Sequence, residues 1–316
     1  MNLHKIIENA DRIAIAGHVK PDGDCTGSCL GLYNFINEYY HKEVHLFLEP
    51  IPRVFHFLQS ADKVEDAKLF NGEKFDVFFA LDCGDLARLG DAGALFESAK
   101  KSICVDHHIS NLAFADENYI FPHASSTCEL IYDLVEYQPI TREIAECLYV
   151  GIVHDTGVFQ YNSTSSKTMN IAGMLMDTGI EYTKIIDDTY YSKTFEQNKA
   201  LGKALLNCEL LFEGKLIFSS ISGEELQLFG ADTQDLDGIV SQLRLTKDTE
   251  AAVFLYETED GCQKVSMRSN GLVNVASITE SVGGGGHMRA AGATVSGSCE
   301  QVKQLIMDKI KEQTGW

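Results

Sequence analysis

Four apolar segments of this chain end abruptly in histidine and aspartate, a pattern that strongly restricts the possible folds. The run Ile103-Cys104-Val105 leads directly into Asp106-His107-His108. A strand that is apolar along its length and then strongly polar delivers its polar side chains to the carboxyl edge of a sheet, where open α/β proteins build their sites. The other three segments are residues 13–17 before His18, Asp22 and Asp24, residues 77–81 before Asp82, and residues 149–153 before His154 and Asp155. Their convergence predicts one metal site.

The spacing of apolar residues predicts two domains of different architecture. At 316 residues the chain is long for a single core. From residue 12 onward, short apolar runs alternate with helical periodicity, which is typical of βαβ units and a mainly parallel, doubly wound sheet. Further on, the strand-like segments 250–256 and 263–268 are joined by so short a turn that they must be antiparallel. We expect an α/β domain over residues 1–187, a helical linker over 188–212 and a smaller mixed α+β domain over 213–316.

Strand and helix signals place the individual elements. The expected strands of the first domain are residues 12–17, 43–48, 75–81 and 102–105, with a helix after Asp24. Ser126 and Thr127 are typical helix caps, and Thr141 opens a further helix whose far end carries Asp155. A helix over 165–177 closes this domain. In the second domain we expect strands at 215–221 and 293–295 and helices at 232–245, from Asn274 and from Cys299.

Composition limits the partners and the compartment. The formal net charge of −20 argues against a protein that coats long duplex nucleic acid, because such binding needs many contacts from Lys and Arg to phosphates. It does not exclude a small anionic substrate, since clustered carboxylates can hold divalent cations. Nine cysteines without a secretory signal indicate reduced thiols. No apolar run approaches the ~20 residues of a membrane span. We therefore expect a cytoplasmic protein that does not bind a membrane.

The first motif is His18-x-x-x-Asp22-x-Asp24, in which Pro21 and Gly23 form a turn that can aim three side chains into one cavity. Alone, such a turn is more often merely solvated. Hard divalent ions prefer carboxylate ligands, and imidazoles shift the preference from magnesium towards manganese or another transition ion. Two ions about 3.5–4 Å apart need a bridging carboxylate. The full ligand set fits a two-metal hydrolase: His18, Asp22, Asp24, Asp82, His107 and Asp155.

The second motif is a run of four glycines, 283–286, followed by His287 and Arg289. Four glycines alone would indicate a flexible loop. With the attached side chains, Gly285 and Gly286 can bring backbone N–H groups close to an anion while Arg289 clamps it. Arg268 lies on the polar face of an alternating segment, where contact with the same anion competes with simple exposure to solvent.

Together these motifs resemble the DHH phosphoesterase family, and within it the group of bifunctional oligoribonucleases and 3′-phosphoadenosine-5′-phosphate (pAp) phosphatases. The resemblance spans nearly the whole chain. It is carried by residues 18–28 (HVKPDGDCTGS), Asp82, residues 106–111 (DHHISN), residues 155–157 (DTG) and residues 284–292 (GGGHMRAAG). It implies a catalytic N-terminal domain with two manganese ions, for which magnesium or cobalt could substitute. It also implies a C-terminal domain that closes over the active-site cleft and holds the nucleotide.

The resemblance also implies roles for individual residues. His18, Asp22 and Asp82 would hold one ion, and Asp24, Asp82, His107 and Asp155 the other, with Asp82 bridging. Asp106 would orient His107, as metal-bound imidazoles generally require. His108 would face the reacting phosphate and stabilise its charge or donate a proton. Arg268, Gly285, Gly286, His287 and Arg289 would contact the substrate, while the role of His154 stays open.

The implied reaction is metal-assisted hydrolysis of short oligoribonucleotides to mononucleotides and of pAp to AMP and phosphate. Alternatives within the enzyme class are a linear or cyclic dinucleotide phosphodiesterase and a RecJ-like single-strand exonuclease. The exonuclease would need a longer, more basic chain to follow a nucleic-acid strand. A non-catalytic nucleotide-binding regulator would be expected to lack metal ligands, and none is missing from the motifs. The sequence does not rank dinucleotides against pAp or RNA against DNA, and it leaves a homodimer open.

Overall fold

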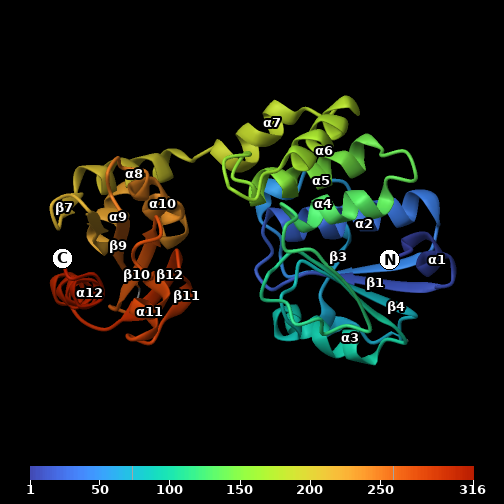
Figure 1. The fold of residues 1–316 in the computed structure, drawn as a ribbon, viewed down its shortest axis with the longest axis horizontal. Coiled ribbons are helices and arrows are strands. Elements are labelled where there is room, and N and C mark those ends of the chain that lie inside the picture. The colour runs from blue at the N-terminus through green and yellow to red at the C-terminus, as the bar shows by residue number, and fades with distance from the viewer. Residues whose placement is uncertain (73, 259) are drawn as a thin grey trace. The chain divides into compact units, whose positions relative to one another are not determined.

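The computed structural model describes every residue except Glu73 and Glu259. These residues form two compact units, Met1–Ser192 and Lys193–Trp316 (Figure 1). The division falls inside segment 188–212, which we predicted to be a linker. Helix α8 (Phe195–Leu206) and strand β7 (Glu209–Leu211) both begin after the division, so most of that segment is part of the second unit.

The first unit contains a six-stranded sheet in the order β3-β2-β1-β4-β5-β6, with every neighbouring pair parallel. The strands are Arg12–Ala16 (β1), Glu43–Phe47 (β2), Val64–Glu65 (β3), Val77–Leu81 (β4), Ser102–Asp106 (β5) and Glu117–Ile120 (β6). The predicted parallel α/β architecture is thus confirmed. The strand order reverses between β1 and β4, which is where open α/β sheets bind their ligands. Strands β3 and β6 were not predicted, because one has only two residues and the other is only half-buried.

Helices cover both faces of this sheet, with α2, α4 and α5 on one side and α3 on the other (Figure 1). Alternate residues of β1 explain the two layers: Ile13 and Ile15 pack into the core beneath α2 and α5, whereas Ala14 and Ala16 face the layer that contains Phe96 of α3. The helices are Leu3–Glu8 (α1), Gly23–Tyr39 (α2), Gly93–Ser98 (α3), Thr127–Val135 (α4), Arg142–Asp155 (α5), Ser166–Asp177 (α6) and Tyr182–Ile186 (α7).

The second unit contains a mixed six-stranded sheet in the order β11-β12-β10-β9-β8-β7, in which only β8 and β9 are parallel neighbours. The strands after β7 are Leu216–Ile221 (β8), Ala251–Glu257 (β9), Gln263–Ser269 (β10), Gly285–His287 (β11) and Ala290–Val295 (β12). The helices after α8 are Gly223–Phe229 (α9), Ile239–Arg244 (α10), Val275–Glu280 (α11) and Cys299–Thr314 (α12). The antiparallel pair β9–β10 confirms the predicted hairpin and the mixed architecture.

The helix predicted over 232–245 is wrong in its extent. The structure has a short 3-10 turn, Thr233–Leu236, and then α10 from Ile239. Gly238 separates them because its φ of 86° lies in the left-handed region, outside helical geometry. Helix α9 was not predicted at all, although Ser222 and Glu225 form a capping box at its start.

The structure contains no disulfide bond among its nine cysteines, all of which lie in the described part of the chain. All nine cysteines are free thiols. Six of them are buried in the first unit, namely Cys25, Cys29, Cys83, Cys104, Cys128 and Cys147. Within the described parts of the chain, no helix combines the length and the apolar character that crossing a membrane requires.

Candidate metal centre

The predicted ligands of the first unit lie together at the carboxyl edge of the parallel sheet. His18 follows β1, Asp82 follows β4, and Asp106 to His108 end and follow β5. Because β1, β4 and β5 are parallel neighbours, these three ends meet at one edge. Helix α5 adds Asp155 from its last turn, where we had placed it on a helix rather than on a strand.

The buried carboxylate of Asp82 faces two imidazoles with its two different oxygens. Oδ2 lies 3.5 Å from Nε2 of His18, and Oδ1 lies 3.6 Å from Nε2 of His107. Asp82 has a φ of 57°, a left-handed conformation that aspartate adopts more readily than most residues. A carboxylate whose oxygens point to separate histidines has the geometry to bridge two cations.

A second group of donors lies around His107. Its Nε2 is 3.2 Å from Oδ2 of Asp155 and 3.8 Å from Oδ2 of Asp24. The Asp24 side chain is held by the start of α4, where the backbone N–H groups of Thr127 and Cys128 donate to its two oxygens across 2.6 and 2.9 Å. These bonds, together with the positive end of the helix dipole, stabilise negative charge at Asp24.

Two side chains close to the centre were missed by sequence reasoning. The hydroxyl of Thr127 donates to Oδ1 of Asp82 across 3.0 Å, so one residue fixes both Asp82 and Asp24. The thiol of Cys25 lies within 4.8 Å of ligand atoms of His18 and Asp82. No sequence spacing connects residue 127 with residues 24 and 82, whereas Cys25 directly follows Asp24 of the first motif.

The electrostatics of the centre favour a bound cation. Burial raises the pKa of Asp24 well above its usual value, and the neighbouring Asp82 and Asp155 raise it further. Burial and the charge of Asp82 also raise the pKa of Asp155, to about 7. These carboxylates repel one another in a poorly solvated place, and a divalent cation between them would relieve that repulsion. The donor set of carboxylate oxygens and imidazole nitrogens therefore fits divalent metal ions.

His18 and Asp22 form a pair at the start of α2. Nε2 of His18 lies 3.6 Å from Oδ2 of Asp22, whose Oδ1 caps the helix by accepting from the N–H groups of Asp24 and Cys25. Burial by itself lowers the pKa of His18, but Asp22 and Asp82 outweigh burial and raise it to about 11. The pKa of Asp22 correspondingly falls to about 2: burial opposes this shift, but the contact with His18 and the helix-start amides outweigh it. In solution without metal, a proton on His18 partly takes the place of a cation.

Asp106 contacts His108, whereas we had expected it to orient His107. Its Oδ1 is 2.7 Å from Nδ1 of His108, and its Oδ2 accepts from Nδ2 of Asn111 across 2.6 Å. The hydrogen bond to Asp106 raises the pKa of His108 to about 9. His108 remains 41% exposed, so a cationic imidazole is presented to solvent beside the metal ligands. Asp106 is the last residue of β5 and His108 lies two residues later, so their side chains can point to the same side.

His154, whose role was open, belongs to none of the groups of possible metal donors among the described residues. Its Nε2 lies 2.9 Å from the hydroxyl of Thr189, and its ring packs edge-on against Phe55 and Tyr190. Burial lowers its pKa to about 4. A Cβ atom on Gly23 would lie 2.5 Å from the His154 ring, so this histidine packs directly against the backbone between Asp22 and Asp24.

The predicted substrate-contacting residues lie near one another in the second unit. Arg268 on β10 pairs in register with Ala290 on β12, and Ala290 in turn pairs with His287 on β11. His287 and Arg289 are exposed. The guanidinium of Arg289 lies over Gly271, 3.3 Å from where a Cβ atom would be, and Arg268 donates to the carbonyl of Met267. One end of this sheet therefore carries two guanidinium groups and an imidazole.

The glycine run forms an edge strand instead of a loop of free amides. The N–H groups of Gly283 and Gly284 donate to the carbonyls of Glu280 and Thr279 and so close α11. Gly285 and Gly286 belong to the exposed strand β11. Gly286 has a φ of 146°, and a Cβ atom there would lie 2.5 Å from Cα of Ala291, so only glycine allows the strands to approach this closely.

Comparison with known proteins gives a consistent result over almost the whole chain. Residues 12–152 match the model described as "DHH family, N-terminal domain", and residues 214–315 match the "DHHA1 domain". The "Bifunctional oligoribonuclease and PAP phosphatase NrnA" of Thermus thermophilus is 31% identical over 306 residues, which are 95% of this chain and 90% of that protein.

Two other similar proteins carry different names. The "Cyclic-di-AMP phosphodiesterase PdeA" of Listeria monocytogenes is 29% identical over 328 residues, which cover 96% of this chain but only 48% of that protein. A crystal structure of an exopolyphosphatase-related protein from Bacteroides fragilis superimposes with a TM-score of 0.90 at 27% identity. That match covers 99% of this chain and 95% of the other.

Proposed function

Because the chain belongs to the DHH family, we propose that it is a metal-dependent phosphoesterase that hydrolyses short oligoribonucleotides to mononucleotides and pAp to AMP and phosphate. The observation that carries this proposal is the Asp82 carboxylate, which faces His18 and His107 with separate oxygens in a chain that matches a bifunctional oligoribonuclease and PAP phosphatase over 95% of its length. If one site hydrolyses both oligoribonucleotides and pAp, the two reactions must share one chemical step.

That step is hydrolysis at a phosphorus atom attached to the 3′-oxygen of the first nucleotide. A water oxygen bonds to phosphorus, the bond from phosphorus to the 3′-oxygen breaks, and the 3′-oxygen takes up a proton. In pAp the phosphoryl group released is inorganic phosphate, whereas in an oligonucleotide it remains on the next nucleoside. The mononucleotide is the leaving group in both cases, so one arrangement of residues serves both substrates.

We propose that two manganese ions occupy the centre, one on His18, Asp22 and Asp82 and the other on Asp24, Asp82, His107 and Asp155. Such ions supply Lewis-acid stabilisation of phosphoryl oxygens and a water molecule of lowered pKa. Thr127 holds the carboxylates of Asp24 and Asp82 in place through its N–H and hydroxyl groups. Two imidazoles among the ligands support manganese over magnesium as the preferred ion.

His108 is the proposed catalytic residue outside the metal ligands, and Asp106 positions it. With its pKa raised to about 9 by Asp106, His108 is cationic at neutral pH. It can stabilise the charge that develops on the phosphoryl group or give its proton to the departing 3′-oxygen.

In the second unit, we propose that Arg268, His287 and Arg289 bind phosphate of the nucleotide, together with Gly285 and Gly286. The proximity of two guanidinium groups and an imidazole at one sheet end supports this role. The nine free thiols support the reducing cytoplasm as the compartment.

Parallel incubation with pApA, pAp and a 24-mer RNA in manganese, followed by analysis of products, tests the proposal. We expect AMP from pApA and AMP with phosphate from pAp, with little release from the 24-mer. The similarity to a cyclic-di-AMP phosphodiesterase makes cyclic di-AMP the fourth substrate to include. Cleavage of that substrate alone would replace this proposal with the cyclic dinucleotide alternative, and efficient cleavage of the 24-mer would favour an exonuclease.

A further inference from the structure

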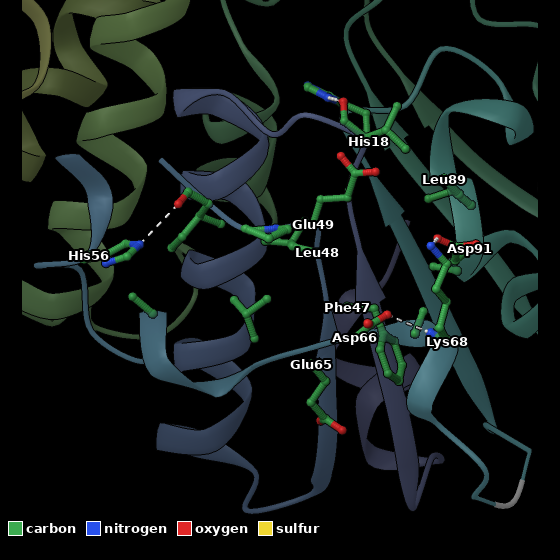
Figure 2. Close-up of a pocket in the computed structure, with 18 of the residues that line it drawn as sticks. His18, Phe47, Leu48, Glu49, His56, Glu65, Asp66, Lys68, Leu89 and Asp91 are labelled. Atoms are coloured by element: carbon green, nitrogen blue, oxygen red, sulfur yellow. Dashed lines mark hydrogen bonds and ion pairs between the residues drawn. The ribbon is translucent and has the colours of Figure 1, made fainter. Parts of the chain in front are cut away.

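A cavity of about 640 Å³ lies beside the metal centre, at the carboxyl ends of β1 and β2 (Figure 2). His18 belongs both to the metal centre and to the wall of this cavity. Small-molecule sites in open α/β proteins lie at this edge of the sheet, and they enclose roughly 300–1,000 Å³. The cavity therefore has the position and size of a binding site that adjoins the reacting phosphate.

The wall of the cavity includes a set of buried apolar side chains. Phe47 and Leu48 come from the end of β2, and Leu89 comes from the 3-10 segment Leu86–Ala92 (Figure 2). Each of the three is less than 8% exposed. Phe47 and Leu89 pack in one buried cluster and Leu48 packs in another, so this part of the wall is apolar and rigid. A flat heterocycle such as a nucleobase buries its faces favourably against such a surface.

The carboxylates that line the cavity all have partners within the first unit. Oε2 of Glu49 accepts from the N–H of Lys20, Glu65 lies 2.8 Å from His45, Asp91 lies 3.0 Å from Nζ of Lys68, and Asp66 accepts from the N–H of Lys68. These partners hold the acidic groups in place and offset part of their charge. The cationic side chains of the same lining are Lys68 and Arg53.

Arg53 differs from these groups. It begins the 3-10 turn Arg53–Phe55 directly after Pro52, it is exposed, and it lines the cavity. Among the residues that the structure describes, no hydrogen bond or ion pair of its guanidinium is found. His56, one turn later, uses Nε2 on the carbonyl of Ile51. Arg53 is thus an exposed guanidinium on the cavity lining that is available for a phosphate.

We propose that this cavity binds the nucleoside that follows the scissile phosphate in an oligonucleotide, with its base on the apolar wall and Arg53 on the next phosphate of the chain. This inference rests on the proposed function and extends it to a part of the substrate that pAp lacks. In pAp the reacting phosphoryl group carries no second nucleoside, so the cavity stays empty during that reaction. The cavity is therefore occupied during hydrolysis of an oligonucleotide and empty during hydrolysis of pAp.

The first test fills the cavity. Ala67 lies on its wall in the turn Ala67–Leu69, whereas Leu69 of the same turn is 79% exposed and does not line the cavity. Ala67→Phe should lower the ratio of kcat/KM for pApA to kcat/KM for pAp by about tenfold, since burial of a base contributes on the order of 1–3 kcal/mol. Leu69→Phe should leave that ratio at the wild-type value. Equal ratios in Ala67→Phe and wild type would overturn the proposal.

The second test removes the cation and does not depend on how the protein accommodates a larger side chain. Arg53→Ala should lower kcat/KM for pApApA about tenfold or more relative to pApA, because only the trinucleotide carries a further phosphate. Lys63→Ala removes the same charge from an exposed residue that does not line the cavity and should leave the ratio unchanged. An equal ratio for Arg53→Ala and Lys63→Ala would show that Arg53 has no such contact and contradict its assignment.

Wild-type protein that hydrolyses pAp but not pApA would overturn the cavity assignment while sparing the phosphatase activity. Wild-type protein that hydrolyses neither would overturn the proposed function itself.

Discussion

Nδ1 of His108 donates to Oδ1 of the fully buried Asp106 across 2.7 Å. The bond raises the pKa of His108 to about 9, so the imidazole is cationic below that pH and loses its charge above it. Replacement of the carboxylate by an amide should return the pKa of His108 towards its ordinary value near 6.5.

Asp106→Asn should therefore shift the pH dependence of catalysis. In the wild type, kcat should fall as the pH rises through about 9. In the variant the fall should begin near pH 7, which makes the loss at pH 8 about tenfold or more. The measurement is a pH profile of kcat on pAp at saturating manganese, with metal content determined in parallel. Superimposable profiles would mean that the state of His108 does not matter for the reaction.

Removal of metal should abolish activity. The centre consists of the buried carboxylates of Asp24 and Asp82 and two histidines. In the proposed reaction, water is activated by metal ions bound to these side chains. We expect EDTA to eliminate hydrolysis of pAp, and manganese to restore it better than magnesium because two ligands are imidazoles. Rates after dialysis and addition of each ion check this expectation, and full activity in metal-free buffer would contradict it.

Two substitutions should separate metal binding from chemistry. Asp82→Ala removes the carboxylate that faces both His18 and His107, so we expect loss of bound metal together with activity. His108→Ala should retain the metal and lower kcat by about 10²–10⁴, the usual contribution of acid–base or electrostatic help. Metal analysis of both purified variants decides the matter. Equal loss of metal would place His108 among the ligands.

The metal-free protein should become less stable as the pH rises from 6.5 to 8. The folded pKa of Asp155 is raised to about 7, above the 3.8 of an ordinary aspartate, so the folded state binds the additional proton. Stability from this group is fully present only below about pH 3.8 and is lost progressively up to about pH 7, so only the last part of its loss lies between pH 6.5 and 7. Most of the fall between pH 6.5 and 8 comes from His18 and His108, whose pKa values rise from 6.5 to about 11 and about 9, so that they keep a proton in the folded state that the unfolded chain releases.

Melting temperatures of the EDTA-treated protein at pH 6.5 and pH 8 test this prediction. Asp155→Asn should show a smaller fall between the two pH values, since its side chain does not titrate. Manganese should stabilise the protein more at pH 8, where the carboxylates are ionised without protons to displace. A melting temperature of the metal-free protein that rises with pH over this interval would contradict the assignment.

Arg289→Ala should raise KM with the metal content unchanged. A charge-assisted bond to phosphate contributes about 1.5–3 kcal/mol, so KM should increase by roughly tenfold or more. In the wild type, turnover should be highest for oligomers of two to four nucleotides and depend only weakly on salt, because few phosphates are bound. Steady-state kinetics on pAp and on an RNA length series provide the measurement. Equal rates on a dinucleotide and a 24-mer, with a normal KM for the variant, would contradict this role.

The close approach of the proposed metal ligands could be predicted because it follows from the geometry of a parallel sheet. His18, Asp82 and His107 follow separate apolar runs, and neighbouring parallel strands must end at the same edge. Asp155 could be placed on a helix because Thr141 is a typical cap. Each of these inferences depends on local spacing, which a sequence contains directly.

The arrangement around those ligands could not be predicted in the same way. Thr127 reaches Asp24 and Asp82 only because the start of α4 meets the start of α2 and the end of β4, which no local pattern records. The direction of the Asp106 carboxylate depends on side-chain conformations after a strand end, so its partner was assigned to the wrong histidine. Strand β3 was missed because two residues carry no periodicity.

The six buried thiols of the first unit make the folded and unfolded chains chemically different. Burial raises the pKa of Cys25, Cys83 and Cys128, among others, and thiols that remain protonated and inaccessible do not undergo exchange. Once unfolded, the same chain exposes all nine sulfur atoms at ordinary reactivity. In air, a chain that oxidises while it is unfolded is withdrawn from refolding, which makes its unfolding irreversible. Outside a reducing environment, the working lifetime of this protein is therefore governed by how often it opens and not by the depth of its free-energy minimum.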